Sequence, residues 1–510
     1  MFVKLRTIFN SLNKPFWVIL FFATTSFFYN YTNVEYVKNM LSHNLPATVD
    51  LKYGYTYTGP DDFNYVDPAK NFVNGKGYII DTTNQYLNVR RTPGYSVFYG
   101  VHYVIFGEKY SYYTIRFSQC ILFGLSVWLL YLTVINLGFG QKIANYSKFI
   151  YGFSPFVVGF LFNTITEGIH PASVIALLYF YSLAKVKGNL KYFFIAGLIG
   201  AIVILIRPTN ILAPMIIGFI FLVEFIQKKL NFKSLAFYAL GLFVLWSPWV
   251  IRNYQLKHEF IPLEKYYISP TNYGALQLPF ERFWMCWGNP RHEYMLNNIS
   301  FDLPKEDKYA TIDQFIKEQP AYTYEGISKK DLRNVLIEVS ACYKEMYEKR
   351  KGLLMYKHTD SVLLCDQKLH DKFELLSKKF AQNAPFTVYV YAPLVVRMKA
   401  FIFHSFSSSY PTLNNAGNQP FKWWQVVVKS VFMLLNISLF IALFFSLLYL
   451  KKNINLLFLI LFPISSMLFY VYYYHIEARY ILSSYPFLAV LLAFSLDKLL
   501  SIFTRKPVQI

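Results

Sequence analysis

The chain has 510 residues, of which 55% are hydrophobic, 20% are aromatic and only 15% are charged. This composition is too apolar for an ordinary water-soluble domain and indicates a membrane protein. The formal net charge of +21 would suit a nucleic-acid-binding protein, but many of the basic residues fall in short loops between apolar runs. That is the positive-inside pattern, so the charge reports membrane topology and excludes a nucleic-acid partner.

The apolar runs predict an all-α polytopic membrane protein with about ten transmembrane helices. The first run is interpreted as a retained helix, because it lacks a convincing signal-peptide cleavage site and many spans follow it. An even number of spans with basic loops inside predicts a multi-pass protein of the plasma (inner) membrane with both termini in the cytoplasm. The predicted spans are 15–32, 110–137, 143–164, 168–184, 190–206, 209–227, 234–251, 426–450, 454–473 and 480–500.

Two long segments remain on the outer, periplasmic or extracellular side. Residues 33–109 form a first outer loop, and their short apolar piece at 95–106 predicts a helix lying in the membrane interface. The second segment, 252–425, carries charged helical stretches and predicts a mainly helical extramembrane domain. This domain would separate an N-terminal transmembrane module, 1–251, from C-terminal transmembrane helices at 426–510.

The four cysteines give few constraints. Cys120 falls in a predicted helix, whereas Cys286, Cys342 and Cys365 fall in the outer segment without Cys-x-x-Cys spacing. One disulfide could form among these three, and the spacing supports no zinc site.

The first outer loop contains two adjacent carboxylates, Asp61 and Asp62. If a short helix begins near Asp61, then Tyr65 lies on the same face one turn later. Two carboxylates beside a low-dielectric surface should raise the pKa of at least one of them, which suits a general base. The alternative is a helix N-cap, and composition weighs the two equally. Glu167 lies between two predicted spans, where a simple cap is the commoner role.

Basic side chains lie at the predicted outer ends of other spans. Arg207, Arg252 and Arg479 each adjoin an apolar run, and His475 is four residues before Arg479. A guanidinium group binds phosphate through two hydrogen bonds, so arginines converging on this face favour a clamp for a lipid-linked phosphate. Contact with lipid headgroups is the alternative for any one of them.

Taken in order, these motifs resemble the GT-C membrane glycosyltransferases, especially the bacterial branch of the protein mannosyltransferase and aminoarabinose transferase group. The resemblance covers 15–265 and 426–500. In the first outer loop it rests on an acidic residue with Tyr four positions later, Gly-x-Gly-Tyr and Arg-x-Pro-Gly-Tyr. The later elements are Thr166-Glu167, Arg207-Pro208, Pro248 to Asn253 with Phe260-Ile261-Pro262, and Glu477-Ala478-Arg479-Tyr480 with Tyr485-Pro486.

The resemblance implies that one sugar moves, with inversion, from a polyprenyl-phosphate donor to a hydroxyl of a lipid, glycan or protein acceptor at the outer membrane face. The family pattern makes Asp61 the catalytic base, with Asp62 as its neighbour and Glu167 as a second acidic position. Members of the superfamily differ in metal dependence, so a divalent metal ion stays open as a cofactor. The candidates for donor phosphate binding are Arg207, Arg252, His475 and Arg479, and those for substrate binding are Tyr65, Arg90 and Arg91.

Two other classes of protein remain as alternatives. A flippase or transporter of lipid-linked sugars would fit the architecture, but the predicted helix middles contain essentially no ionisable groups, which argues against an ion-coupled carrier. A polysaccharide polymerase or ligase would use a diphosphate-linked donor, and the sequence does not show the donor's head group. The segment 265–425 does not match the family pattern, so it leaves the acceptor open.

Overall fold

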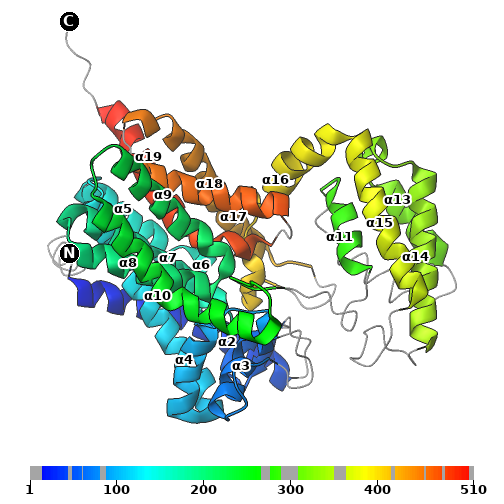
Figure 1. The fold of residues 1–510 in the computed structure, drawn as a ribbon, viewed down its shortest axis with the longest axis horizontal. Coiled ribbons are helices and arrows are strands. Elements are labelled where there is room, and N and C mark those ends of the chain that lie inside the picture. Colours follow the sequence, from blue (N-terminus) through cyan, green and yellow to red (C-terminus); the bar gives the residue numbers. More distant parts are fainter. Residues whose placement is uncertain are drawn as a thin grey trace, which may run out of the picture. The chain divides into compact units, whose positions relative to one another are not determined.

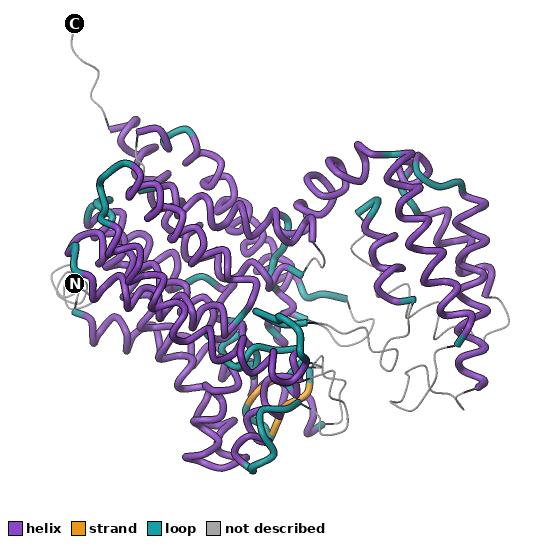
Figure 2. Tube along the Cα trace, viewed as in Figure 1, coloured by secondary structure: helices purple, strands orange, loops and turns teal. Residues whose placement is uncertain are grey.

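The structure, a computed structural model, divides the chain into two compact units that are both mainly helical (Figures 1 and 2). Unit 1 comprises Met1–Lys265, Ile402–Met467 and Ala478–Ile510, and unit 2 comprises Tyr266–Phe401 and Leu468–Glu477. The residues that the structure describes are 14–43, 49–59, 61–80, 88–265, 276–288, 308–349, 363–414, 420–452, 455–473 and 477–504.

Unit 1 is a set of apolar helices in which α8 packs on α7 and α10, and α4 packs on α2, α5 and α7. Short 3₁₀ helices, labelled η, join several of them. The helices in its N-terminal part are α2 (Pro15–Ser42), α3 (Phe63–Val73), α4 (Gly94–Asn136), α5 (Gln141–Gly152), α6 (Pro155–Val158), η2 (Thr166–Gly168), α7 (His170–Lys187), α8 (Leu190–Ile206), η3 (Pro208–Ile211), α9 (Leu212–Ile226) and α10 (Phe232–Lys257).

The C-terminal part of unit 1 adds further helices, and α19 packs on α5 and α17. Among them, α18 continues from unit 1 into unit 2 at Leu468. The elements are η6 (Ser407–Ser409), η7 (Pro411–Leu413), α17 (Trp423–Leu447), η8 (Leu450–Lys452), α18 (Leu456–Tyr473), η9 (Ala478–Ser484) and α19 (Tyr485–Thr504).

Turn residues explain where several helices end and begin. Gly188 follows α7 with φ of 63°, the left-handed conformation that glycine adopts without a steric penalty. The next residue, Asn189, caps α8 by accepting a hydrogen bond from Lys191 N at 2.9 Å. Asn231 caps α10 in the same way, through Ser234 N at 2.8 Å. These local signals place sharp turns between successive apolar helices.

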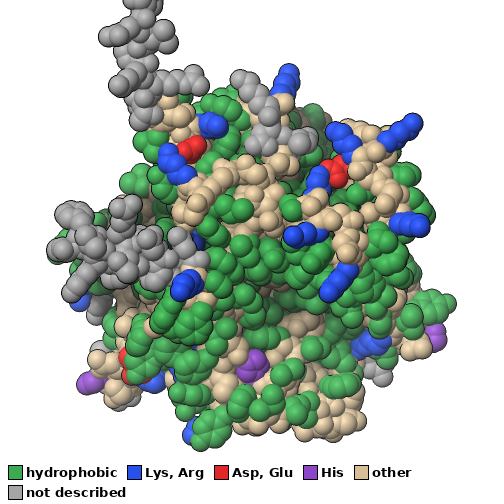
Figure 3. All heavy atoms as spheres, turned by 90° about the vertical axis from the view of Figure 1, so that its left-hand side faces the viewer, with side chains coloured by type: hydrophobic (Ala, Val, Ile, Leu, Met, Phe, Trp, Pro, Cys, Tyr) green, Lys and Arg blue, Asp and Glu red, His purple; other side chains and the backbone are tan. Residues whose placement is uncertain are grey.

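Five described helical stretches are long and apolar enough to cross a membrane. The surface of α10 illustrates why, because Leu240, Phe243 and Val244 are 51%, 55% and 47% exposed, as side chains facing lipid would be. On the face shown in Figure 3, hydrophobic side chains cover most of the surface between groups of Lys and Arg. The stretches are Gly94–Asn136, Pro208–Ile226, Phe232–Lys257, Trp423–Leu447 and Ala478–Ile502, with shorter apolar helices at Leu190–Ile206 and Leu456–Tyr472. The predicted count of about ten spans stays a prediction.

The structure corrects one predicted span and extends two other helices. The span predicted at 143–164 was wrong as a single helix, because α5 ends at Gly152 and Pro155 forces Ser154 into an extended conformation. Helix α2 continues ten residues beyond its predicted end at 32. The helix predicted at 95–106 is present, and it runs into the next span through a kink at Gly107, whose φ is 71°.

The first outer loop also contains two short strands that the all-α prediction missed. Strands β1 (Asp50–Lys52) and β2 (Thr56–Thr58) pair antiparallel, with Leu51 opposite Tyr57. Tyr57 N also donates to Phe162 O at 3.0 Å. The hairpin is therefore attached to the segment that leads into η2.

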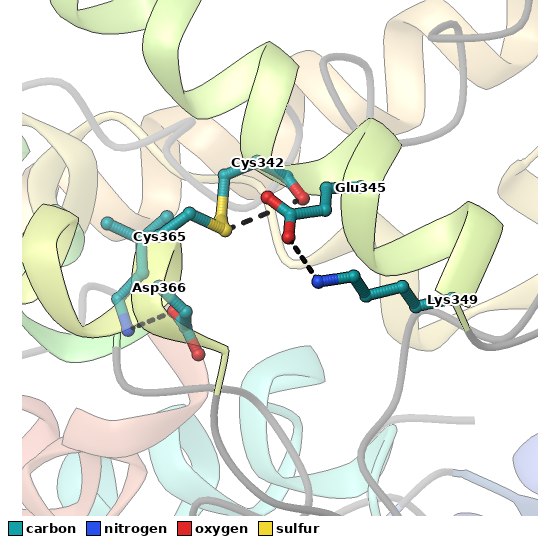
Figure 4. Close-up of a disulfide and its surroundings, with 6 residues drawn as sticks. Cys342, Glu345, Lys349, Cys365 and Asp366 are labelled. Carbon is teal, nitrogen blue, oxygen red and sulfur yellow. Dashed lines mark hydrogen bonds and ion pairs between the residues drawn. A yellow bond between two sulfur atoms is a disulfide. The ribbon is translucent and has the colours of Figure 1, made fainter.

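Unit 2 is a helical domain with an aromatic core. Buried rings of Phe280, Trp284 and Phe373 pack together, and α15 contacts both α11 and α14. A disulfide joins Cys342 on α14 to Cys365 on α15 (Figure 4). The other two cysteines, Cys120 and Cys286, are free and buried. The elements are α11 (Gln277–Met285), α13 (Lys308–Glu318), η4 (Ala321–Glu325), α14 (Lys329–Lys349), α15 (Leu364–Asn383), the π-helix η5 (Thr387–Arg397) and α16 (Met398–Ile402), which ends in unit 1.

Helix α4 begins directly against the end of α8. A Cβ atom on Gly94 would lie 2.5 Å from Ile206 N and 2.6 Å from Leu205 O. We expect Gly94→Ala to force the two backbones apart and to reduce the free energy of unfolding by about 1–3 kcal/mol, the usual effect of overpacking. Thermal unfolding of the detergent-solubilised protein measures this. The matched control is Gly100→Ala, whose Cβ would meet the Ala69 Cβ at an ordinary 3.5 Å; equal melting temperatures for the two variants would contradict the prediction.

Candidate active site

Three carboxylates and three arginines from six separate segments of unit 1 form an alternating row of ion pairs. Each arginine lies close to a carboxylate, and we call this set the ion-pair row. In order, its members are Glu264, Arg91, Asp61, Arg479, Glu167 and Arg207. The successive distances are 3.8 Å (Glu264 Oε2 to Arg91 Nη1), 3.7 Å (Arg91 Nη2 to Asp61 Oδ1), 3.1 Å (Asp61 Oδ2 to Arg479 Nη2), 3.8 Å (Arg479 Nε to Glu167 Oε1) and 2.8 Å (Glu167 Oε1 to Arg207 Nη1).

Glu167 is the buried carboxylate of the row, with 3% of its side chain exposed. It lies in η2, where Thr166 Oγ1 donates to its Oε2 at 3.1 Å. Burial by itself would raise the pKa of Glu167, but the charges of Arg207 and Arg479 outweigh burial and hold the pKa well below its usual range. Glu167 therefore holds two arginines together as a permanent anion.

The two adjacent aspartates have different surroundings. Asp61 faces Arg91 and Arg479, whereas Asp62 Oδ2 accepts a hydrogen bond from Gly59 N at 3.2 Å. Burial, with a smaller contribution from the Asp61 charge, raises the pKa of Asp62 to about 7. The sequence predicted that one pKa of the pair would be raised. In the structure, Asp62 is the residue with the raised pKa, and Asp61 is the residue that contacts the arginines.

The three residues predicted to bind substrate lie around the same row. The Arg91 guanidinium is 5.5 Å from the centre of the Tyr65 ring, and that ring is edge-on to Tyr95 at 5.7 Å. Arg90 is near enough to act on Glu264, whose pKa is raised by burial against the charges of Arg91, Arg207 and Arg90. Arg91 is therefore a direct neighbour of Asp61, whereas Tyr65 lies beside Arg91 and Arg90 acts on Glu264.

Arg252 lies apart from these contacts. Its Nη1 donates to Asn88 O at 2.8 Å, its Nη2 donates to Tyr78 O, and its guanidinium lies 4.8 Å from the Trp249 ring centre. These bonds attach α10 to the first outer loop, which is a scaffolding role. Phosphate binding by Arg252 stays a prediction without a described contact to the ion-pair row. His475 lies outside the described residues.

Sequence reasoning missed Glu264, which a well-anchored strap, residues 258–265, brings to the row. The strap follows α10, and three consecutive carbonyl groups of it accept hydrogen bonds from α10 side chains. The bonds are Asn253 Nδ2 to Ile261 O (3.0 Å), Trp246 Nε1 to Pro262 O (2.7 Å) and Trp249 Nε1 to Leu263 O (2.6 Å). The motifs containing Trp249, Asn253 and Phe260 to Pro262 could have pointed to Glu264, because their residues form the strap and fix it to α10.

No group of three or more His, Cys, Asp or Glu side chains suited to a metal ion occurs among the described residues. The carboxylates of the row are instead each paired with arginine. We therefore identify no set of ligands for a divalent metal ion among the described residues.

Part of the chain that forms this site matches a known protein family. Residues 90–251 match the model of the dolichyl-phosphate-mannose-protein mannosyltransferase family. The chain resembles the GT-C membrane glycosyltransferases. The matched stretch contains Arg91, Glu167 and Arg207 of the ion-pair row, so half of the row belongs to the part of the chain that resembles this glycosyltransferase family.

Two solved structures align with this glycosyltransferase-like chain at low similarity. The oligosaccharyltransferase of Archaeoglobus fulgidus, in a complex with Zn and sulfate, is 13% identical with a TM-score of 0.37 and is aligned over 87% of this chain and 46% of its own. ArnT from Cupriavidus metallidurans, bound to undecaprenyl phosphate, is 12% identical with a TM-score of 0.32, over 87% of this chain and 74% of its own. The chain thus spans less than half the length of the first of these. No curated protein matches the chain.

Proposed function

We propose that the chain transfers one sugar from a polyprenyl-phosphate donor to an acceptor hydroxyl group at the outer face of the membrane, with inversion at the anomeric carbon. The observation that carries this proposal is the position of Asp61 between Arg91 and Arg479. A carboxylate suited to remove a proton is thereby held beside cations suited to stabilise a leaving phosphate.

The charges of the site favour an anionic ligand. The ion-pair row contains three carboxylates and three arginines, and Arg90 adds a further positive charge near Glu264. Asp62, with its pKa raised to about 7, offsets this charge only in part at neutral pH. Taken together, these residues carry a positive balance, which suits a phosphate group.

In this mechanism the polyprenyl tail stays among apolar helices, and the donor never leaves the bilayer. The acceptor oxygen attacks the anomeric carbon from the side opposite the phosphate, while Asp61 takes the hydroxyl proton. The bond between the anomeric carbon and the phosphate oxygen breaks, and its electron pair stays on the phosphate. Arg479, held between Asp61 and Glu167, and Arg207 behind it stabilise that charge.

Reconstitution separates this reaction from the alternatives. Purified protein in vesicles with polyprenyl-phosphate sugars should form a new glycosidic bond, which mass spectrometry detects together with free polyprenyl phosphate. Relocation of intact donor would instead indicate a flippase, and turnover of diphosphate-linked donors alone would indicate a polymerase or ligase. In cells that lack the chain, we expect the lipid-linked sugar to accumulate and a surface glycan to be one residue short.

The disulfide of unit 2 supports the outer location of this unit, because disulfides persist mainly in oxidising compartments. We expect a membrane-impermeant maleimide to label half-buried Cys365 in intact cells only after treatment with an impermeant reductant. A gel-mobility shift measures the labelling, and the matched control Cys365→Ser should lose the signal that depends on reduction. Labelling that requires cell lysis would place unit 2 in the cytoplasm and contradict the proposed topology.

A further inference from the structure

Arg91 is shared between two carboxylates. Its Nη2 lies 3.7 Å from Asp61 Oδ1, and its Nη1 lies 3.8 Å from Glu264 Oε2. Both distances exceed the roughly 3.2 Å limit of a normal N–H···O hydrogen bond. The side chain of Arg91 is only 14% exposed and lies beside the Tyr65 ring. The guanidinium is therefore confined between the two acids.

Glu264 is held in place through its backbone. The strap that carries it is fixed to α10 at three consecutive carbonyl groups, 261–263. Just beyond Glu264, Lys265 N donates to Val89 O at 3.1 Å, two residues before Arg91. The strap and the segment that carries Arg91 are thus joined directly, which sets the separation of Glu264 from Arg91.

An arginine in close two-point contact with Asp61 would favour the charged carboxylate and weaken it as a base. A second fixed carboxylate on the far side of the same guanidinium competes for it. We propose that Glu264 is a positioning residue that holds Arg91 partly away from Asp61 and so keeps Asp61 able to accept a proton. The statement that Asp61 must accept a proton rests on the proposed function, whereas the contacts of Arg91 with Asp61 and Glu264 do not.

On the other side of Asp61, Arg479 Nη2 does donate a hydrogen bond to Asp61 Oδ2, at 3.1 Å. Among the residues that the structure describes, Arg91, Arg479 and the adjacent Asp62 are charged groups that act on or lie against Asp61. Arg479 is likewise shared with a glutamate, Glu167. Glu167 is 3% exposed and Glu264 is 22% exposed, so a substitution at Glu264 disturbs packing less and gives the cleaner test.

A thiol at position 61 tests the proposal without any substrate. In Asp61→Cys, the pH dependence of alkylation by iodoacetamide at residue 61, followed by peptide mass spectrometry, gives the midpoint of thiol ionisation. In Asp61→Cys with Glu264→Gln, Arg91 loses its second anion and pairs with the thiolate. Because a nearby cation favours the charged form of an acid, we expect the midpoint to fall by about half a pH unit or more.

Three further variants in the Asp61→Cys background separate positioning from general effects. Glu264→Asp keeps the negative charge and should leave the midpoint nearly unchanged. Glu108→Gln is the matched control, because Glu108 pairs with Lys70 at 2.6 Å and not with the ion-pair row; it should cause no fall. With Arg91→Gln already present, Glu264→Gln should cause much less of a fall, since its effect passes through Arg91.

An unchanged midpoint in the Glu264→Gln variant would overturn the proposal, as would an equal fall in the Glu108→Gln control. A lower melting temperature without a change in the midpoint would assign Glu264 a purely structural role and would also overturn it. If the Glu264→Gln variant does not fold, the Arg91→Gln variant tests the premise that Arg91 acts on residue 61, because removing an effective cation raises the midpoint. An unchanged midpoint in that variant would overturn the proposal. A shifted midpoint in a protein that shows no transfer would refute the proposed function and leave this arrangement intact.

Discussion

Asp61→Asn is expected to slow sugar transfer by about a hundredfold or more, the scale on which a general base contributes. The amide keeps the size of the side chain but cannot take the acceptor's proton. Asp61 has 32% of its side chain exposed, so we expect folding and membrane insertion to be retained. The measurement is the rate of product formation in reconstituted vesicles, with the melting temperature recorded for the same preparation.

The matched control for Asp61→Asn is Asp62→Asn, because the two aspartates are adjacent and differ in their partners. Asp62 accepts a hydrogen bond from Gly59 N and lacks a described ion pair with the arginines of the row. We expect it to lose less than about tenfold in rate. The reverse ranking would make Asp62 the base, and near-normal turnover in Asp61→Asn would remove Asp61 from that role.

Much of the candidate site could be predicted from the sequence, because its charges sit where apolar runs end. A charged side chain is costly within the bilayer, so Glu167, Arg207 and Arg479 must lie at helix ends. The basic loops then assign those ends to one side of the membrane. The structure brings these three residues and Asp61 together, although sidedness alone predicts only a common level in the membrane.

Knowing that two residues lie at the same membrane level does not predict whether they contact each other. This is why the sequence placed Arg252 in the site without a described contact to support it, and why it did not identify Glu264. Arg252 ends the same kind of span as the other arginines, but its guanidinium is taken up by the carbonyl groups of Tyr78 and Asn88. Glu264 reaches the row because Trp249 and other α10 side chains fix the strap and because Lys265 N donates to Val89 O. Such bonds connect residues far apart in sequence, so no local pattern reveals them.

Hydropathy alone also predicted one helix incorrectly. The run 143–164 is apolar enough for one span, yet Pro155 ends the helix because a proline disfavours the helical conformation of the residue before it. The cysteine spacing likewise gave no reason to choose a disulfide among Cys286, Cys342 and Cys365. The structure pairs Cys342 with Cys365 because they lie on neighbouring helices, and it leaves Cys286 buried.

Arg479→Ala is expected to reduce kcat by about a hundred- to a thousandfold and to weaken donor binding as well. Arg479 is the member of the row that contacts both Asp61 and Glu167, at 3.1 Å and 3.8 Å. Its removal takes away a cation beside the leaving phosphate and also leaves Glu167 with less positive charge around it. Steady-state kinetics with varied donor concentration, and binding of undecaprenyl phosphate alone, measure the two effects separately.

Two control variants make the interpretation of Arg479→Ala specific. Arg479→Lys keeps the charge but replaces the planar guanidinium by a single ammonium group, so it should retain one of the two ion pairs. Its kcat and its donor affinity should therefore lie between those of the wild type and Arg479→Ala. Arg252→Ala removes an arginine predicted at the same membrane level that lacks a described contact with the row. It should lower the melting temperature through the lost bonds to Tyr78 and Asn88 while weakening the binding of undecaprenyl phosphate much less. If Arg479→Ala changed only the KM for the acceptor, the arginine would belong to the acceptor site, because a phosphate clamp must act on the donor and on the leaving group together.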